Sequence, residues 1–170
     1  PRYSSSAASD VYKRQADIRT QKIIIEELIK AKPDWSFLAE EKSDQTSQQS
    51  KNRFIIDPID GTTNFLHGNP NFAISIAAEI EGRLEAGIVY CPIYDELFFA
   101  ERGKGAYLND RRLRIAKRNR LSEALVVTGI PHLGRGNIEK FINEIKQIMP
   151  EVSGIRTVSY THLRAHETVS

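Results

Sequence analysis

The stretch that decides the fold is residues 54–67, which read Phe-Ile-Ile-Asp-Pro-Ile-Asp-Gly-Thr-Thr-Asn-Phe-Leu-His. The apolar residues at its start are typical of the end of a buried strand, and Pro58, which has no backbone N–H, predicts that the strand stops there and turns. Gly61 permits a sharp bend and the close approach of an anion. Thr62 and Thr63 are residue types that cap helices, so we expect a short helix to begin there.

This turn brings together groups suited to a metal ion and to a phosphate. Asp57 and Asp60 stand three positions apart, and carboxylates are ligands that hard divalent cations prefer. The expected helix N-terminus presents backbone amides, which suit an anion. An Asp-x-x-Asp-Gly turn also occurs without any function, so the turn taken alone leaves both interpretations open. An EF-hand loop is excluded, because it would need a glutamate at the position of Gly68.

Residues 56–68, Ile-Asp-Pro-Ile-Asp-Gly-Thr-Thr-Asn-Phe-Leu-His-Gly, resemble the first signature of the inositol monophosphatase family. The segment Leu38-Ala39-Glu40-Glu41 resembles the upstream Glu-Glu element of that family and lies at the expected distance. Ala16-Asp17 resembles a still earlier aspartate. The resemblance runs from residue 16 to residue 157.

The resemblance implies a Mg²⁺-dependent phosphatase that hydrolyses inositol monophosphate, or a similar small phosphorylated alcohol, by a metal-activated water. It implies two or more Mg²⁺ ions, held by Glu40, Asp57, Asp60 and the carbonyl group of Ile59. It gives catalytic roles to Glu40, Thr62 and Asp17, and phosphate binding to Asp60, Gly61, Thr62 and Thr63. The parent protein is then expected to be a homodimer.

We expect an α+β fold, a mostly antiparallel sheet flanked by helices, which resembles the N-terminal part of the family's α-β-α-β-α fold truncated at both ends. Apolar periodicity predicts helices over 16–32 and 138–149. Closely spaced strands with turns between them predict a meander over 72–100, with a further turn at 109–112 followed by a short apolar segment, 113–115. Another buried strand is expected over 124–128.

The first helix and the strand after it place two further acidic groups. In the helix predicted over 16–32, Ile24, Leu28 and Ala31 share the apolar face, and Asp17 falls in the first turn, where it would cap the helix. The resemblance suggests instead that Asp17 lies near the metal ions, through a water. A short strand over 35–39 should lie beside strand 53–56, so that Glu40 and Asp57 emerge at the same sheet edge.

The later helix and two reactive side chains have simpler interpretations. Six apolar residues follow one side of the helix over 138–149 and predict core packing, namely Ile138, Phe141, Ile142, Ile145, Ile148 and Met149. Cys91 has no neighbouring histidine, and His67 does not suit an oxygen-seeking cation. We leave both outside the predicted site.

The two ends differ from the middle of the chain. Residues 1–15 and 158–170 lack apolar periodicity and resemble translated adapter sequence, so we predict that they are non-native tails around a partial inositol monophosphatase-like domain, 16–157. Without these tails Lys+Arg falls from 24 to 20 and Asp+Glu from 22 to 20. The remaining chain is neutral, and its basic stretch over 111–120 lacks interleaved aromatics, so no nucleic-acid partner is expected.

The compartment follows from cysteine content and hydropathy. The sequence has one cysteine and no apolar run long enough to span a membrane. We therefore predict a cytoplasmic protein with no membrane partner.

The chain also departs from the family pattern. No Trp-Asp-x-Ala element is present, because the only tryptophan, Trp35, is followed by Ser36. We also expect no helical segment before Asp17. The chain therefore reads as an N-terminal fragment that binds metal weakly and has little or no activity. Two alternatives stay open: a 3′(2′),5′-bisphosphate nucleotidase or fructose-1,6-bisphosphatase-like enzyme, and a non-catalytic partner-binding module that uses 111–120.

Overall fold

The computed structural model describes residues 4–39, 50–131 and 136–157. The chain divides into two compact units, Pro1–Arg114 and Ile115–Ser170, which are described separately below. No helix in the described ranges combines the length and the apolar character needed to cross a membrane. The elements of the first unit are α1 (Ser4–Ala31), β1 (Ser36–Ala39), β2 (Asn52–Asp60), α2 (Thr62–Leu66), β3 (Ala73–Ile80), β4 (Arg83–Cys91), β5 (Glu96–Glu101), β6 (Gly105–Leu108) and β7 (Arg111–Arg112).

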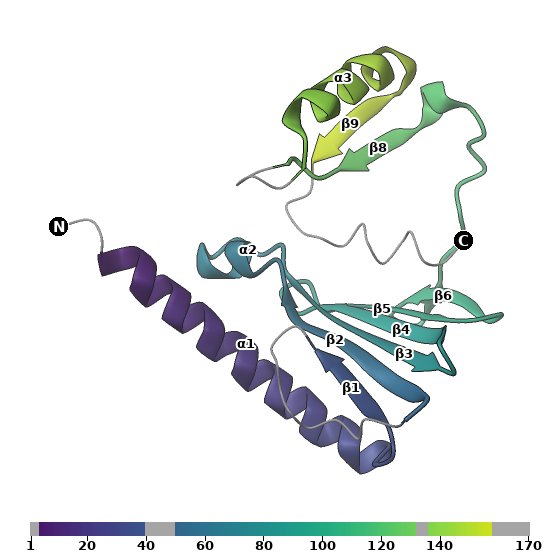
Figure 1. Ribbon diagram of the computed structural model, residues 1–170. Coiled ribbons are helices and arrows are strands. Elements are labelled where there is room, and N and C mark those ends of the chain that lie inside the picture. The colour runs from purple at the N-terminus through teal and green to yellow at the C-terminus, as the bar shows by residue number, and fades with distance from the viewer. Residues whose placement is uncertain (1–3, 40–49, 132–135, 158–170) are drawn as a thin grey trace. The chain divides into compact units, whose positions relative to one another are not determined.

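The strands of the first unit form one seven-stranded sheet in the order of the sequence, β1 to β7 (Figure 1). β1 and β2 are parallel, and every other neighbouring pair is antiparallel. The turn between β3 and β4 consists of Glu81 and Gly82, with φ of 51° and 80°, the left-handed conformations of a tight hairpin turn. The predicted meander and the predicted α+β fold class are confirmed.

The end of the meander differs from the expectation. Arg111 and Arg112 pair with Leu108 and Tyr107 as the strand β7, so the turn occupies only the residues between β6 and β7. The predicted turn over 109–112 was therefore wrong by two residues, because Asn109 adopts a left-handed φ of 51° and reverses the chain at once. The apolar segment at 113–115 forms no strand.

Helix α1 lies along β1 and β2 (Figure 1). The buried centre of this contact consists of Ile25, Phe37 and Ile56, against which the half-buried Leu28 and Phe54 pack. The helix begins at Ser4 rather than at residue 16, so the expectation that no helical segment precedes Asp17 was wrong. Ala31, predicted to face the core, is exposed because the helix ends there beyond the edge of the contact.

The second unit contains η1 (Leu121–Glu123), β8 (Leu125–Thr128), α3 (Ile138–Ile148), η2 (Met149–Glu151) and β9 (Gly154–Thr157). β8 and β9 pair in parallel, and the chain passes from one to the other through α3. The side chain of Asn137 caps α3 by accepting a hydrogen bond from the Lys140 N–H at 2.9 Å. The helix predicted over 138–149 and the strand predicted over 124–128 are therefore confirmed as elements. The predicted burial of the strand was wrong, because Leu125 and Val127, which alternate with half-buried residues along β8, are 51% and 41% exposed.

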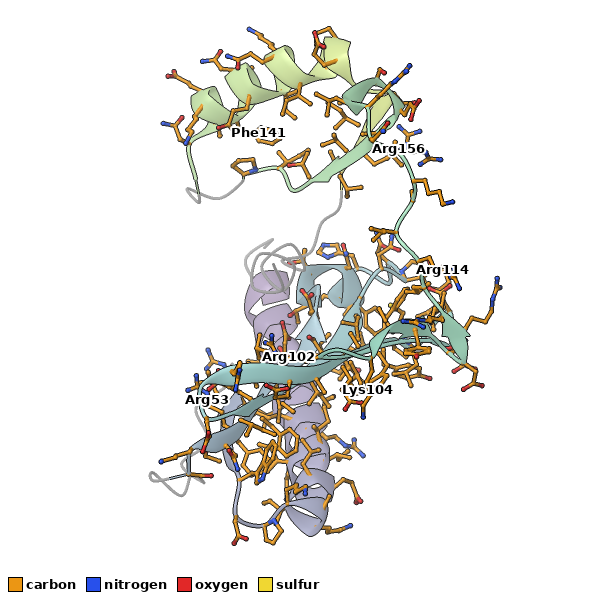
Figure 2. The ribbon with its side chains drawn as sticks, turned by 90° about the vertical axis from the view of Figure 1, so that its right-hand side faces the viewer. Arg53, Arg102, Lys104, Arg114, Phe141 and Arg156 are labelled. Atoms are coloured by element: carbon orange, nitrogen blue, oxygen red, sulfur yellow. The ribbon has the colours of Figure 1, made fainter. Side chains whose placement is uncertain are left out.

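The predicted core stripe of α3 is only partly buried. Phe141, which lies on the side of α3 facing the strands (Figure 2), is half-buried, as are Ile145 and Ile148. The other three members of the stripe, Ile138, Ile142 and Met149, are exposed. Two strands are too narrow to cover an apolar helix face that spans 100° or more.

Candidate metal and phosphate site

Strand β2 continues through Pro58 and ends at Asp60, so the prediction that it stops at Pro58 was wrong. Asp57 pairs with Ser75 and Asp60 with Ala73 on β3, and the register shifts between these pairs. Two residues of β2 therefore oppose one residue of β3, which is a β-bulge. A bulge leaves a residue unpaired, and so it accommodates a proline that has no N–H to donate. The strand bends instead of ending, and it leads directly into α2.

Gly61 makes the sharp turn between β2 and α2. Its φ of 86° and ψ of 36° are left-handed, and a Cβ atom added to it would lie 3.0 Å from the carbonyl oxygen of Asn71. Gly61 is the N-cap residue of α2, and its carbonyl accepts a hydrogen bond from the Phe65 N–H at 3.1 Å. The helix begins at Thr62 as predicted, but the expected capping by a threonine side chain was wrong.

Thr62 uses its side chain in another way. Its hydroxyl donates a hydrogen bond to the carbonyl oxygen of Ile59 at 2.9 Å, which ties the first residue of α2 to the bulge. Asp60 and Ile59 are buried, and Asp57 is half-buried with a buried Oδ1 atom. Thr63 is exposed at the start of α2. The turn thus presents oxygen atoms from two carboxylates, one carbonyl and one hydroxyl within six consecutive residues.

Asp17 lies in the interior of α1, more than three turns from Ser4, so its predicted place in the first turn was wrong. It is 5% exposed, and Gln21, one turn further along, is 4% exposed. Ile25 follows after another turn and belongs to the buried core. One face of α1 therefore changes from polar to apolar along its length. Sequence reasoning missed Gln21, although its spacing of four from Asp17 and from Ile25 marks the shared face.

The strand pairing next to the site agrees with the prediction. β1 lies beside β2, and Ala39 is opposite Ile56. Glu40 and Glu41 lie outside the described residues. In the ranges 4–39, 50–131 and 136–157 no group of three or more His, Cys, Asp or Glu side chains is placed to hold a metal ion. The metal-ligand set that includes Glu40 therefore stays a prediction.

His67 and Cys91 have ordinary surroundings. A ring nitrogen of the exposed His67 lies 2.8 Å from the carbonyl oxygen of Thr63, one turn earlier. Cys91, a free thiol at the end of β4, is half-buried. Burial raises the pKa of this thiol, and the nearby Glu96 carboxylate raises it further. A raised pKa disfavours the thiolate that a nucleophile would need.

The sequence of the turn and of its surroundings matches a known family. The model of the inositol monophosphatase family matches residues 4–165. The chain belongs to the inositol monophosphatase family. The match reaches into both terminal segments that were predicted to be non-native.

Individual relatives agree with this assignment. An inositol-1-monophosphatase of Rhizobium meliloti is 51% identical over 152 residues, which are 89% of this chain and 57% of that protein. The Nus factor SuhB of Pseudomonas aeruginosa is 38% identical over 149 residues, 85% of this chain and 55% of that protein. The crystal structure of the extragenic suppressor protein suhB from Bartonella henselae superposes with a TM-score of 0.81 at 48% identity, covering 91% of this chain and 59% of that one. The chain thus spans somewhat more than half the length of these proteins.

Proposed function

We propose that the chain carries part of the active site of a Mg²⁺-dependent phosphomonoesterase, which hydrolyses inositol monophosphate or a similar small phosphorylated alcohol. The observation that carries the proposal is the bulged turn, which brings Asp57, Asp60 and Gly61 together within five residues of the segment that resembles the family signature.

The donor set of the turn fits Mg²⁺. Asp57, Asp60 and the Ile59 carbonyl offer only oxygen atoms, which hard cations prefer. The parallel pairing of Ala39 with Ile56 supports Glu40 as a further ligand, because Glu40 and Asp57 are the residues that follow this pair in the sequence. Two or more Mg²⁺ ions bound here would supply a water of lowered pKa and stabilisation of the leaving alkoxide.

Phosphate binding falls to the residues at the start of α2. The backbone amides of Gly61 and Thr62 would donate to phosphate oxygens, with Asp60 and Thr63 completing the phosphate-binding set. The Thr62 hydroxyl donates its own proton to Ile59, so its oxygen retains lone pairs that can accept a hydrogen bond from the attacking water.

Two acidic residues would act around that water. Asp17, buried on α1, would help to orient it, and Glu40 would share this role. Gly61 would contribute through its left-handed turn into α2, because the space left by its missing Cβ is filled by the Asn71 carbonyl and is not open to the phosphate.

The setting of the reaction is also part of the proposal. We place the protein in the cytoplasm, since its single cysteine is a free thiol. We expect the complete protein to be a homodimer that binds a small phosphorylated substrate and no nucleic acid, with the native domain covering residues 16–157 of this chain. The chain alone should bind Mg²⁺ weakly and release little or no phosphate.

A chimera tests the activity. Residues 16–157 would be joined to the remaining C-terminal part of the Rhizobium meliloti relative, which is 51% identical over the shared region. The chimera is expected to release phosphate from inositol 1-phosphate only in the presence of Mg²⁺. Asp57→Asn should reduce the rate at least about a hundredfold, because a ligand carboxylate is lost, whereas Asp110→Asn at an exposed turn should leave it unchanged. A folded chimera without Mg²⁺-dependent phosphate release would contradict the proposal.

The same chimera distinguishes the substrates. Rates with inositol 1-phosphate, with an adenosine 3′,5′-bisphosphate and with fructose 1,6-bisphosphate would be compared. A higher kcat/KM for either of the last two would assign the protein to the corresponding alternative within the family.

The relative named Nus factor SuhB favours a second candidate, a partner-binding role that needs no catalysis. The exposed basic stretch 111–120 would then serve as the binding surface. The chimera with Asp57→Asn separates the two functions. If it still replaces SuhB in Pseudomonas aeruginosa cells, the binding role is supported, whereas loss of both functions together would argue for the enzyme.

A further inference from the structure

Asn64 is a buried polar residue in the short helix that follows the turn. It is 7% exposed, and its Nδ2 atom donates a hydrogen bond to the carbonyl oxygen of Asn71 at 2.6 Å. Asn71 lies in the segment that leads from α2 into β3. A buried side-chain amide is costly unless its hydrogen bonds are made, so this contact fixes the position of the Asn71 carbonyl relative to α2.

The same carbonyl group packs against Gly61. It lies 3.0 Å from the position that a Gly61 Cβ atom would take, and the Cα atom of Phe72 lies 3.4 Å from that position. The Asn71 carbonyl therefore fills the side of Gly61 on which other residues carry a side chain. The Asn64 amide, the Asn71 carbonyl and the Gly61 backbone form a continuous set of contacts, which we name the Asn64 clamp.

The segment behind the clamp is held by contacts within itself. The Asn71 N–H donates to Oδ1 of Asn69 at 3.0 Å, and the Asn69 N–H donates to the Asn64 carbonyl at 2.9 Å. The rings of Phe65 and Phe72 meet edge to face, with centroids 5.2 Å apart. Residues 64–72 thus form a braced loop rather than a loose connection.

A third contact reaches Asn71 from the turn between β4 and β5. The Tyr94 hydroxyl donates to Oδ1 of Asn71 at 3.3 Å. Asn71 is therefore held on its side chain by Tyr94 and on its carbonyl group by Asn64. Tyr94 itself is exposed, so a change there has little effect on the core.

We propose that Asn64 is a positioning residue for the phosphate-binding turn, an inference that rests on the proposed function. Glycine populates positive and negative φ about equally, so Gly61 alone does not fix the direction of its own amide or of the Thr62 amide. The clamp restricts Gly61 to its left-handed conformation of φ 86°. It thereby aims both amides at one point before a phosphate arrives, and this pre-organisation increases the affinity for phosphate.

The test uses the chain itself and inorganic phosphate in the presence of Mg²⁺. The amide signals of Gly61 and Thr62 would be followed by ¹H–¹⁵N NMR during a phosphate titration. Asn64→Asp keeps the shape of the side chain and removes the Nδ2 donor, and it is expected to weaken phosphate binding about tenfold. Asn69→Asp makes the same chemical change at an exposed site and keeps the Oδ1 acceptor of the Asn71 N–H, so its affinity should stay within about twofold of the wild type.

A neutral variant distinguishes the loss of the hydrogen bond from the effect of an added charge. A measurement without phosphate distinguishes a changed Gly61 conformation from a general loss of stability. Asn64→Leu removes the donor without adding charge, and it should weaken phosphate binding as much as Asn64→Asp. Without phosphate, the HN–Hα couplings of Gly61 should change in both Asn64 variants and remain unchanged in Asn69→Asp. If the Asn64 variants fail to fold, Tyr94→Phe is used instead, and it should weaken binding about two- to threefold by releasing the Asn71 side chain.

The outcomes are distinguishable. If phosphate shifts the wild-type signals but the Asn64 variants bind it equally well, the positioning role is overturned and the proposed function stands. If phosphate leaves the wild-type Gly61 and Thr62 signals unchanged even at Mg²⁺ concentrations that saturate weak binding by the chain, the phosphate-binding role of the turn in the proposed function is contradicted and the inference falls with it. Wild-type affinity in Tyr94→Phe would also count against the clamp.

Discussion

Ala39 of β1 lies opposite Ile56 of β2 in a parallel pair, whereas the other neighbour of β2, β3, is antiparallel to it. Both residues belong to the surface that α1 covers, and Ile56 is one of three buried residues at its centre. β1 ends at Ala39, whereas β2 continues past this pair through Asp57 to Asp60. The packing of Ile56 therefore stabilises β2 directly before Asp57, the first residue of the described part of the candidate site.

Ile56→Ala should destabilise the first unit by about 2–5 kcal/mol, because it removes a buried side chain and leaves a cavity between α1 and the sheet. Ile56 is 3% exposed and packs in a cluster with Ile25 and Phe37. The free energy of unfolding would be measured by urea denaturation. Ile23→Ala is the control. Ile23 lies on α1, as Ile25 does, but it is 54% exposed, so its substitution should change the free energy of unfolding by no more than about 0.5 kcal/mol. Equal losses in the two variants would contradict the assigned core.

Gly61→Ala should be more destabilising than Gly82→Ala. Both glycines have left-handed φ, 86° and 80°, so each substitution costs about 1–2 kcal/mol in backbone strain. A Cβ atom at Gly61 would also lie 3.0 Å from the Asn71 carbonyl oxygen, whereas Gly82 has nothing within 4 Å. The expected additional loss at Gly61 is about 1–3 kcal/mol, measured as the difference between the two unfolding free energies. Equal losses would show that the Asn71 carbonyl can move away from Gly61 at little cost.

Arg53 and Glu79 stand opposite each other on β2 and β3, and Arg53 lies near the start of β2 (Figure 2). The Arg53 Nε atom lies 2.7 Å from Oε1 as an ion pair, and Nη2 donates a hydrogen bond to Oε2 at 3.1 Å. The Glu79 side chain is largely buried, so Glu79→Gln should cost about 1 kcal/mol in low salt, and less in 1 M NaCl because salt screens the charges. Glu26→Gln removes the 3.8 Å pair with Lys22 between two exposed side chains, and it should cost at most a few tenths of a kcal/mol. Urea denaturation at both salt concentrations measures the difference.

Local patterns predicted the elements whose signals lie within a few residues of each other. The meander follows from closely spaced turns such as Glu81-Gly82, and the start of α2 follows from the residues around Gly61. The end of β2 was mispredicted, because Pro58 removes a donor but does not decide whether the strand ends or bulges. That choice depends on the partner strand β3, which the sequence near Pro58 does not contain.

The buried polar residues were the hardest to predict. Asn64 and Gln21 are residue types that usually lie on the surface. Their burial becomes evident only from the contact of α1 with α2 and β2. The N-terminal extension of α1 was missed for a related reason. The residues before Asp17 carry no apolar stripe, and they extend a helix whose buried core contact lies further along, around Ile25. Tertiary packing decides such cases over local propensity.

The raised pKa of the Cys91 thiol predicts a pH dependence. Burial is the larger cause and the Glu96 carboxylate the smaller one, so at pH 8 Cys91 should react with iodoacetamide more slowly than in the chain unfolded by urea. Glu96→Gln should increase the rate but leave it below that of the unfolded chain, whereas Glu101→Gln, further along β5, should not change it.

Because the folded state retains the Cys91 thiol proton at a pH where the unfolded state has lost it, this group's contribution to stability is complete below the pKa of the unfolded thiol. The contribution is then lost as the pH rises through the pKa of the folded one. A Cys91→Ser variant should therefore lose less stability than the wild type between pH 8 and pH 10, and an equal loss would contradict the raised pKa.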